Sequence, residues 1–352
     1  MITTTSISHS KPWLGQNEIH AVTEVIQSHQ IGQGWRVDTF EQSLATYLGV
    51  RGGVAVSSGT AALHLALLAL GVGPGDEIIM PSYVCTAPWI ATTSIGAIPK
   101  IVDIEPTTYN IDPEKVKEAI TGHTRALIVP HLFGLPANVT PLQALKVPVI
   151  EDCAQTLGAT YNGRAVGSLG NVTICSFYAT KLLCTGEGGM VLSNNPATLE
   201  AVRVLRAYDG KRTLNTRSFN FKMTDLHAAL GTCQLDRLQE NLERRAAIAA
   251  RYFSKLDHLP IELPFVPDDR THIFYRFVLK VAQPLDDLLE RLERKGIQGR
   301  RPVYQPIHRY LGLKGYPNSD QAFSSTLSIP IYPSLRDEEV EYIITILCEE
   351  LG

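Results

Sequence analysis

The stretch GGVAVSSGTAALHLALLAL, residues 52–70, places a short apolar run directly before an alanine- and leucine-rich segment. The run is typical of a buried β-strand and the segment of an α-helix, with SSGT as the turn between them. From there to about residue 225, apolar runs keep alternating with helical segments. Because strands that alternate with helices form sheets covered on both faces, the sequence predicts an α/β domain.

Further strands are predicted where valine and isoleucine cluster. These runs are DEIIMPS (76–82), IPKIVDI (98–104), ALIVPHL (126–132), VPVIED (147–152), VTICSFY (172–178) and GMVLSN (189–194). The pattern then changes to one long helical segment at 225–256, an alternating strand at 273–281, and helices at 285–296 and 338–351. We therefore expect a large α/β domain over residues 1–235, N-terminal segment included, and a small α+β domain over residues 236–352.

Composition excludes several classes of function. The 352 residues carry a net charge of -3 with both signs interspersed, which predicts no nucleic-acid surface. The N-terminus lacks the pattern of a secretory signal, and the most apolar helical segment is too short to cross a bilayer. Six dispersed cysteines without a C-x-x-C pair indicate neither a zinc site nor disulfides. We expect a cytoplasmic protein with reduced thiols and no metal or membrane partner.

Ligands of α/β sheets bind beyond the carboxyl ends of the strands, and polar residues gather there in this sequence. In SSGT, Gly59 allows close approach of the backbone, and Thr60 lies where the first helical N–H groups have no partner. The turn therefore suits a phosphate, with an ordinary helix cap as the alternative. Ser176 ends another predicted strand and offers a second hydroxyl to the same anion.

Charged residues follow two more strand ends. Glu151 and Asp152 close VIED, and because side chains alternate along a strand, one of the two faces the ligand. A carboxylate there keeps a heterocyclic nitrogen protonated, with a cap or salt bridge as the alternative. Lys181 lies just beyond Ser176, where partial burial makes an amine nucleophilic, as Schiff-base chemistry requires; a surface lysine is the alternative. Together these are the parts of a pyridoxal 5'-phosphate (PLP) site.

The sequence resembles the DegT/DnrJ/EryC1/StrS family of sugar aminotransferases, within the fold-type-I PLP-dependent enzymes. The motifs that carry the resemblance are GVAVSSGTAALHLAL, GPGDEIIMPSY, VIEDCAQTLGATYNG, SFYATKLLCTGEGGM and NFKMTDLHAALG. The resemblance covers nearly the whole chain. It implies a large domain with a mainly parallel mixed sheet between helices, a small C-terminal α+β domain, and a homodimer with shared active sites.

The resemblance also implies a role for each matching residue. Lys181 would be joined to PLP as a Schiff base and would move the proton in catalysis, with Asp152 paired to the pyridinium nitrogen. The other implied cofactor-binding residues are Gly59, Thr60 and Ser176 for the phosphate, Gln155 for the phenolic oxygen, and Asn220, which would reach the phosphate from the neighbouring subunit.

Two segments depart from the family pattern. Cys85 in PSYVCTAPW stands where many relatives place an aromatic residue on the cofactor ring, so stacking would be weaker or would come from a neighbour such as Tyr83 or Trp89. In VYQPIH (303–308), valine replaces the first histidine of the family's His-Tyr-x-Pro-x-His loop. Tyr304 and His308 match that loop and are candidate substrate-binding residues, together with Glu187 of the glycine-rich loop. For His308 the alternative is packing at the domain seam.

The implied reaction is a two-stage transamination. An amino acid, commonly L-glutamate in this family, would give its amino group to the cofactor, which would pass it to a keto group of a nucleotide-linked deoxy sugar. Relatives with histidine at the lysine position are dehydratases, so Lys181 favours amino transfer. Two alternatives remain: an aminotransferase of another ketone such as a cyclitol, and a catalytically idle PLP-binding regulator.

Overall fold

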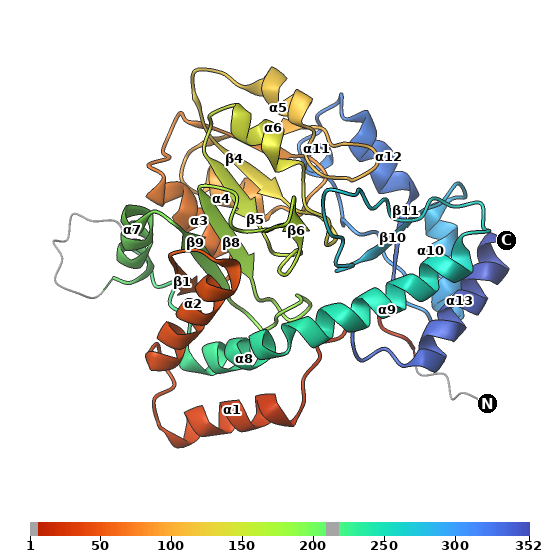
Figure 1. Cartoon of the computed structure of the whole chain (residues 1–352). Coiled ribbons are helices and arrows are strands. Elements are labelled where there is room, and N and C mark those ends of the chain that lie inside the picture. Colours follow the sequence, from red (N-terminus) through yellow and green to blue (C-terminus); the bar gives the residue numbers. More distant parts are fainter. Residues whose placement is uncertain (1–5, 209–217) are drawn as a thin grey trace.

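The computed structural model describes residues 6–208 and 218–352 (Figure 1). Its centre is a seven-stranded sheet. In sheet order the strands are β1 (Gly52–Val56), β9 (Gly189–Ser193), β8 (Val172–Ser176), β5 (Val149–Asp152), β4 (Thr124–Pro130), β2 (Glu77–Pro81) and β3 (Ile98–Val102). Neighbouring strands are parallel except β9, which runs antiparallel to both β1 and β8. The predicted mainly parallel mixed sheet is confirmed.

Helices cover both faces because the strands are apolar on both. Val54 and Val56 of β1 pack on one face, while Ala55 between them packs on the other. The first face carries α3 (Gly59–Ala69), α4 (Ala87–Thr93) and α7 (Pro196–Arg206). The opposite face carries α2 (Trp35–Leu48), α5 (Pro113–Ala119), α6 (Val139–Ala144) and α8 (Asp225–Asp236). The helix α1 (Gln16–Gln27) packs against α8.

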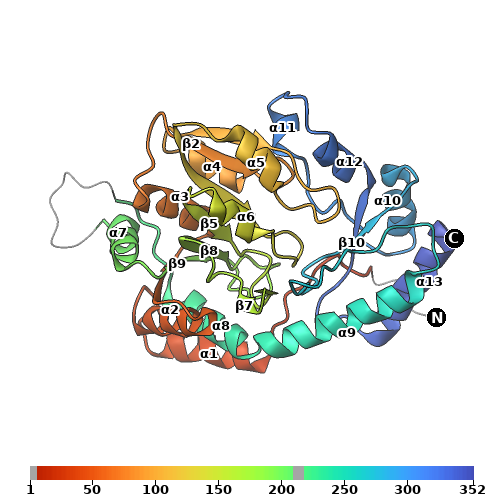
Figure 2. The same ribbon diagram turned by 45° about the horizontal axis from the view of Figure 1, so that its top comes forward.

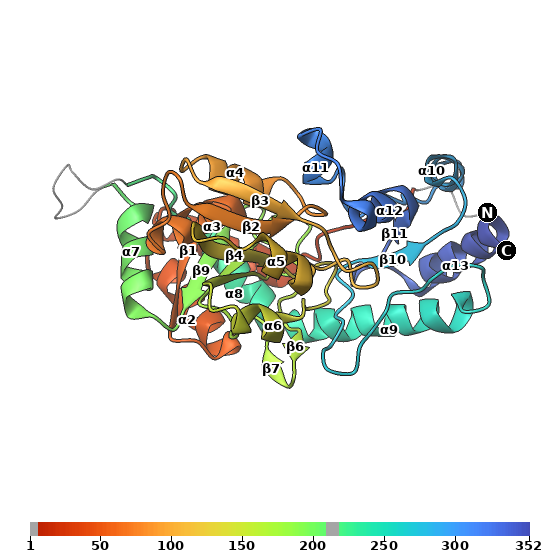
Figure 3. The same ribbon diagram turned by 90° about the horizontal axis from the view of Figure 1, so that it is seen from above.

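The C-terminal part of the chain has an apolar core of its own. It is built on the antiparallel strands β10 (Phe277–Lys280) and β11 (Thr326–Ile329). The helices of this part of the chain are α9 (Leu238–Leu256), α10 (Leu285–Arg294), α11 (Ile307–Tyr310), α12 (Pro317–Ser325) and α13 (Asp337–Leu351). Of these, α11 and α12 place Ile307 and Ala322 in the core on the large sheet. Figures 2 and 3 show this part beside the large sheet, with α9 leading from α8 to the side of α13. A small hairpin, β6 (Thr160–Tyr161) with β7 (Arg164–Ala165), completes the elements. The division after residue 235 stays a prediction.

The first described residues pack with the C-terminal part. The amide of Ile7 donates to the Gly296 carbonyl at 2.7 Å, and the Ile7 carbonyl accepts from Gln298 at 3.0 Å. The Ile7 side chain is buried in the C-terminal core. Two residues later, His9 Nε2 lies 2.8 Å from the Ser328 hydroxyl of β11. This segment therefore brings His9 to the seam between the two parts.

Two predicted elements differ from the structure. The helical pattern at 225–256 forms two helices, α8 and α9, which meet at Arg237, whose guanidinium stacks on the Trp13 ring at 3.7 Å. Of the strand expected at 273–281, only Phe277–Lys280 pairs, because residues 273–276 bond to the large domain instead. Ile273 donates to the Gly134 carbonyl and Arg276 to that of Phe133. This crossing carries Tyr275 and Arg276 toward the carboxyl edge of the large sheet.

Among the described helices, none combines the length and the apolar composition that a membrane span requires.

Candidate active site

Two predicted phosphate-binding segments meet at the carboxyl edge of the sheet. The hydroxyl of Ser58 caps α3 by accepting the Ala61 N–H at 3.1 Å. A Cβ added at Gly59 would lie 2.7 Å from Cβ of Ser176, which is closer than real Cβ atoms approach a neighbour. Only glycine lets the start of α3 pack this closely against the end of β8. Thr60, the next residue, is half-buried at the same helix start.

The two carboxylates at the end of β5 have different roles. Glu151 is fully buried and accepts the N–H groups of Gly167, at 3.0 Å, and Leu169, at 2.8 Å. Burial raises its pKa, but His131 and the backbone N–H groups of Gly170 and Gly167 bring the pKa below the ordinary value. Glu151 therefore anchors the loop before β8. Asp152 alternates to the other face, where its side chain accepts the Ala154 N–H at 3.0 Å.

His131, at the end of β4, belongs to the anchor of Glu151. Its Nδ1 accepts the Ala137 N–H at 3.0 Å, so Nε2 carries the proton that is shared with Glu151 at 3.2 Å. The Cys153 sulfur joins this cluster, whose ligand atoms lie within 4.8 Å of one another. Because backbone N–H groups already occupy the carboxylate oxygens of Glu151, this cluster serves as a structural network.

Lys181 lies in the loop that follows β8, and the glycine-rich segment folds back beside residues 177–179, which begin that loop. The Phe177 amide donates to the Gly188 carbonyl at 2.8 Å. A Cβ at Gly188 would meet the Met223 side chain at 2.5 Å, and φ there is +152°, so this packing requires glycine. Within the described residues the ammonium of Lys181 forms no ion pair, and it lies 5.4 Å from the Tyr275 ring centroid.

Electrostatic coupling shows that Lys181, Asp152 and Cys85 share one site. Burial raises the pKa of Asp152, although the Ala154 N–H and the Lys181 ammonium act to lower it. Loss of hydration raises the pKa of Cys85, which the Lys181 charge lowers and the Asp152 charge raises. Part of Cys85 remains accessible at the surface of the described chain. Tyr83 is fully buried, and its hydroxyl lies 2.8 Å from that of Thr326, across the seam.

The remaining predicted cofactor residues lie around this centre. The Phe133 N–H donates to Oε1 of Gln155 at 2.9 Å, so the Gln155 amide nitrogen is the group that can donate to a ligand. Asn220 is exposed on its own chain, between two phenylalanines whose rings stack 4.9 Å apart. No contact in the described chain brings Asn220 to the other site residues. Thr224 caps α8 by accepting the His227 N–H at 3.4 Å.

The three candidate substrate residues differ in exposure. Tyr304 is 86% exposed, and Glu187 is exposed in the glycine-rich loop. Burial lowers the pKa of His227, and the charge of Glu187 only partly opposes this. His308 is 1% exposed, with Nδ1 at 2.6 Å from the Ser82 hydroxyl and Nε2 at 3.1 Å from Asp320. A substrate could therefore reach the His308 ring only by displacing one of these partners, which favours the seam alternative.

Sequence reasoning missed the residues that cross from the C-terminal part. Tyr275 is buried, and its ring centroid lies 5.4 Å from the Arg276 guanidinium as well as from Lys181. Burial raises the pKa of Tyr275, but Lys181 and Arg276, with a hydrogen bond from Thr180, lower it to about 8. In the sequence, Tyr275 and Arg276 belong to a segment with the pattern of an alternating strand, and no local signal marks them as site residues.

Tyr275 gives a prediction for the protein without cofactor. We expect its phenol to ionise near pH 8, below the value of about 10 for an ordinary tyrosine. Between these values the folded chain has released a proton that the unfolded chain keeps. Its contribution to the free energy of unfolding therefore grows as pH rises through this window, and is lost below it. The phenolate absorbance of wild type minus Tyr275→Phe measures the midpoint, and a midpoint at or above pH 10 would contradict the assignment.

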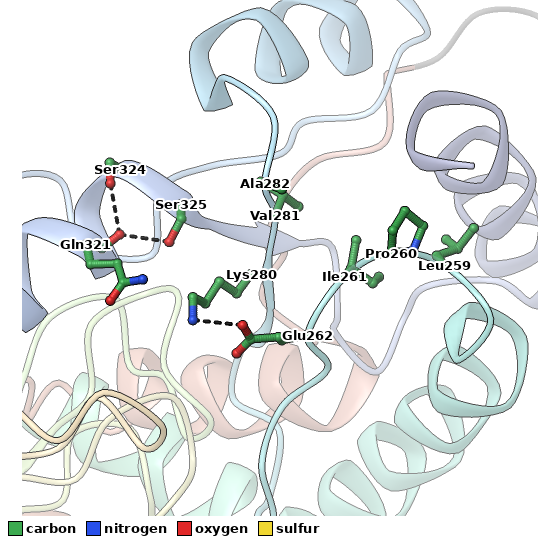
Figure 4. Close-up of a pocket in the computed structure, with 10 residues that line it drawn as sticks. All are labelled: Leu259, Pro260, Ile261, Glu262, Lys280, Val281, Ala282, Gln321, Ser324 and Ser325. Atoms are coloured by element: carbon green, nitrogen blue, oxygen red, sulfur yellow. Dashed lines mark hydrogen bonds and ion pairs between the residues drawn. The ribbon is translucent and has the colours of Figure 1, made fainter.

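A separate cavity of about 590 Å³ lies in the C-terminal part (Figure 4). Residues 259–262, 280–282, Gln321, Ser324 and Ser325 line it. The one lysine among them, Lys280, is paired with Glu262 at 2.8 Å. Since its charge is neutralised and no lining residue belongs to the sheet edge, this cavity is separate from the centre formed by Lys181 and Asp152.

The residues at the sheet edge fit PLP. The cradle of Gly59, Thr60 and Ser176 offers backbone and hydroxyl donors to a phosphate. The pKa of Asp152 is raised by burial, so a positive charge beside it, such as a protonated ring nitrogen, would stabilise its carboxylate. Lys181 carries an amine beside both.

Comparisons with known proteins agree with this chemistry. A sequence model of the DegT/DnrJ/EryC1/StrS aminotransferase family matches residues 12–348. The spore coat polysaccharide biosynthesis protein SpsC of Bacillus subtilis (strain 168) is 35% identical, over 96% of this chain and 95% of its own. GDP-perosamine synthase of Caulobacter vibrioides is 33% identical, over 98% of each chain. Spr1654 from Streptococcus pneumoniae, solved in its PLP form, has a TM-score of 0.92 at 28% identity, covering 99% of this chain and 100% of that one.

Proposed function

The chain belongs to the DegT/DnrJ/EryC1/StrS aminotransferase family, and we propose that it carries an amino group from an amino acid to a keto group of a nucleotide-linked deoxy sugar, with L-glutamate as the donor. It is a PLP-dependent aminotransferase with the fold-type-I architecture. GDP-perosamine synthase and SpsC are relatives along almost their whole length, which supports a sugar substrate.

The observation that carries the proposal is the convergence of Lys181, Asp152 and the Gly59–Ser176 contact at one edge of the sheet. When bound, PLP supplies a ring that withdraws electrons from the carbon that bears the amino group. The carboxylate of Asp152 would hold a proton on the ring nitrogen of the cofactor. Lys181 Nζ would hold the cofactor and, once released, carry the proton between the two reacting carbons.

Other residues would fix the position of the cofactor. Thr60, the Gly59 backbone and Ser176 would bind its phosphate, and the Gln155 amide would donate to its phenolic oxygen. Cys85 would line its ring face, where a thiol contributes less stacking than an aromatic side chain. Tyr304, Glu187 and His308 remain proposed substrate contacts, with His308 requiring the movement described above.

Turnover measurements test the proposal. The protein is loaded with PLP and given L-glutamate with a panel of nucleotide-linked keto sugars and a keto cyclitol, and mass spectrometry detects the aminated product. We expect amination of at least one nucleotide sugar. Amination of the cyclitol alone would support the first alternative. Tight PLP binding with no amination of any ketone would support the idle regulator.

We also propose a cytoplasmic homodimer with shared sites. All six cysteines are free, as in a reducing compartment. The side chain of Asn220 faces outward from its own chain, as a residue that completes a partner's site must. Mixing Lys181→Ala with Asn220→Ala subunits should restore activity, because each mixed dimer regains one intact site. Mixtures no more active than the separate variants would contradict the sharing of sites.

A further inference from the structure

The first turn of α12 is capped by a residue from a distant part of the chain. The N-cap position of the helix, Tyr316, makes no side-chain hydrogen bond to it. Instead, Oδ2 of Asp103 accepts the N–H of Asn318 at 2.9 Å, and Oδ1 accepts the N–H and the hydroxyl of Ser319 at 2.9 Å and 2.6 Å. Asp103 directly follows β3, so its carboxylate attaches α12 to the carboxyl edge of the large sheet.

Burial makes this attachment stronger than an exposed cap. Asp103 is 6% exposed, and no cationic side chain within residues 6–208 and 218–352 forms an ion pair with it. Because a buried carboxylate is costly without partners, it depends on the N–H groups and on the positive end of the α12 dipole. Without the carboxylate, two N–H groups of the first turn would lose their acceptor, and the start of α12 would lose its bonds to the sheet.

A second anchor lies beside the first and holds α11. Ser82 directly follows β2, and its carbonyl accepts the N–H of Ile307 at 2.8 Å. Its hydroxyl lies 2.6 Å from Nδ1 of His308 and accepts the His308 N–H at 3.2 Å. The strands β2 and β3 are paired, and the Ser82 N–H donates to the carbonyl of Val102, the residue before Asp103. Both helices are therefore bonded to one short stretch of the sheet edge.

The first turn of α12 also holds α11 directly. The rings of His308 and Tyr316 stack with their centroids 4.8 Å apart. Nε2 of His308 lies 3.1 Å from Oδ1 of Asp320, which also accepts a hydrogen bond from Arg309 at 2.7 Å. Tyr316 and Asp320 flank the two residues that Asp103 binds. A displacement of this turn would therefore move His308 and the loop that precedes it.

That loop, VYQPIH (303–308), presents one large side chain outward. Val303 and Ile307 are buried in the core on the large sheet, and His308 is buried at the anchor described above. Valine at position 303 thus gives the loop an apolar contact where the family pattern has a histidine. Tyr304 is exposed between these buried residues and remains accessible to a ligand.

We propose that Asp103 is a positioning residue for the acceptor substrate: by capping α12 it fixes His308, and so holds Tyr304 where it contacts the nucleotide-linked sugar. This inference rests on the proposed function, which makes Tyr304 a substrate contact. None of the hydrogen bonds of the Asp103 side chain leads to Lys181 or Asp152. Loss of the cap should therefore impair the acceptor stage of the reaction and leave the donor stage intact.

Kinetics of the two stages test this. PLP-loaded wild type is compared with Asp103→Ala and Asp103→Asn, using L-glutamate and the nucleotide-linked keto sugar that the turnover panel identifies. We expect Asp103→Ala to raise KM for the sugar about tenfold, as for the loss of hydrogen bonds to a charged group, with the donor half-reaction unchanged. Asp103→Asn should be intermediate, because its Oδ1 still accepts from Ser319. The matched control, Asn195→Ala, removes the side-chain cap of α7 and should leave KM unchanged.

A second measurement does not depend on a substrate. Hydrogen exchange of the PLP-loaded protein, read by peptide mass spectrometry, reports the backbone N–H groups of residues 303–320, including the bond from Ile307 to Ser82. We expect faster exchange there in Asp103→Ala, while peptides from β5 and β8 keep the wild-type rate. Ser319→Ala removes only the hydroxyl bond to Asp103 and should give a smaller change in the same direction, so it serves if Asp103→Ala does not fold.

Unchanged KM for the sugar, or unchanged exchange over residues 303–320, would overturn the inference. A donor half-reaction that slows by the same factor as the acceptor stage would also overturn it, since this indicates a general loss of structure. Failure of the proposed function would appear differently, as wild-type enzyme that aminates no nucleotide sugar. The exchange measurement would then still decide whether Asp103 holds the loop.

Discussion

Replacing Lys181 with alanine should abolish the covalent attachment of PLP and reduce amino transfer by about 10⁴-fold, the upper range for a positioned acid–base group. The variant should fold, because Lys181 contributes no ion pair among the described residues and its backbone bond to the Tyr178 carbonyl does not need the side chain. The phosphate cradle of Gly59 and Ser176 remains, so the variant should still bind the cofactor.

Two readouts separate attachment from activity. Borohydride reduction followed by peptide mass spectrometry should label residue 181 in wild type and no peptide in the variant. Turnover should fall in the variant only. The control is Lys117→Ala, an exposed lysine of α5 whose side chain is 67% accessible, and its labelling and rate should match wild type. A Lys181→Ala protein that transfers amino groups at a near wild-type rate would show that another amine performs the chemistry.

The cofactor residues were predictable because of where parallel strands end. Gly59, Asp152 and Ser176 each follow an apolar run, and runs that form parallel strands bring their carboxyl ends to one edge. The motif order identified the family, and the fold and the enzyme class followed from it. These features are local in sequence, so pattern reading could reach them.

The choice between Glu151 and Asp152 shows the limit of residue patterns. Because side chains alternate along a strand, the two carboxylates face opposite sides of the sheet, but this rule does not say which side holds the ligand. The structure supplies the answer through the loop before β8, whose backbone N–H groups at Gly167 and Leu169 bind Glu151. Only the resemblance had assigned Asp152 to the ring nitrogen.

Residues brought together by long-range crossings were not predictable. Phe274 has a φ of 49°, a left-handed conformation that is uncommon outside glycine, and it turns the chain toward the large domain just before β10. That turn places the Tyr275 ring beside Lys181 and the Arg276 guanidinium beside the Tyr275 ring, although the segment reads as a simple alternating strand. His9 reaches the same place through the pairing of Ile7 with the C-terminal part. Neither crossing has a local signature in the sequence.

Replacing Asp152 with asparagine should lower the rate about a thousandfold, which corresponds to about 4 kcal/mol of lost stabilisation in the transition state. Asparagine has nearly the same shape but cannot hold a proton on the ring nitrogen by charge. The cofactor should remain attached, because Lys181 and the phosphate cradle are unchanged. Rapid-mixing measurements of the donor half-reaction, compared with wild type, test this directly.

Although Asp152→Asn should slow the reaction, it should not lower the free energy of unfolding of the apo-protein. Burial raises the pKa of Asp152 above its unfolded value, so its charged form is disfavoured in the folded apo-protein at neutral pH. Asparagine carries no charge and so avoids the cost of burying the carboxylate. Denaturation of the apo-protein should therefore give an unchanged or higher free energy of unfolding. Glu151→Gln is the matched control. An amide nitrogen would face backbone N–H donors there, so we expect a loss of about 1–3 kcal/mol in stability with catalysis retained in the folded fraction. Unchanged kinetics in Asp152→Asn, with a slowed donor half-reaction in Glu151→Gln, would exchange the two assignments.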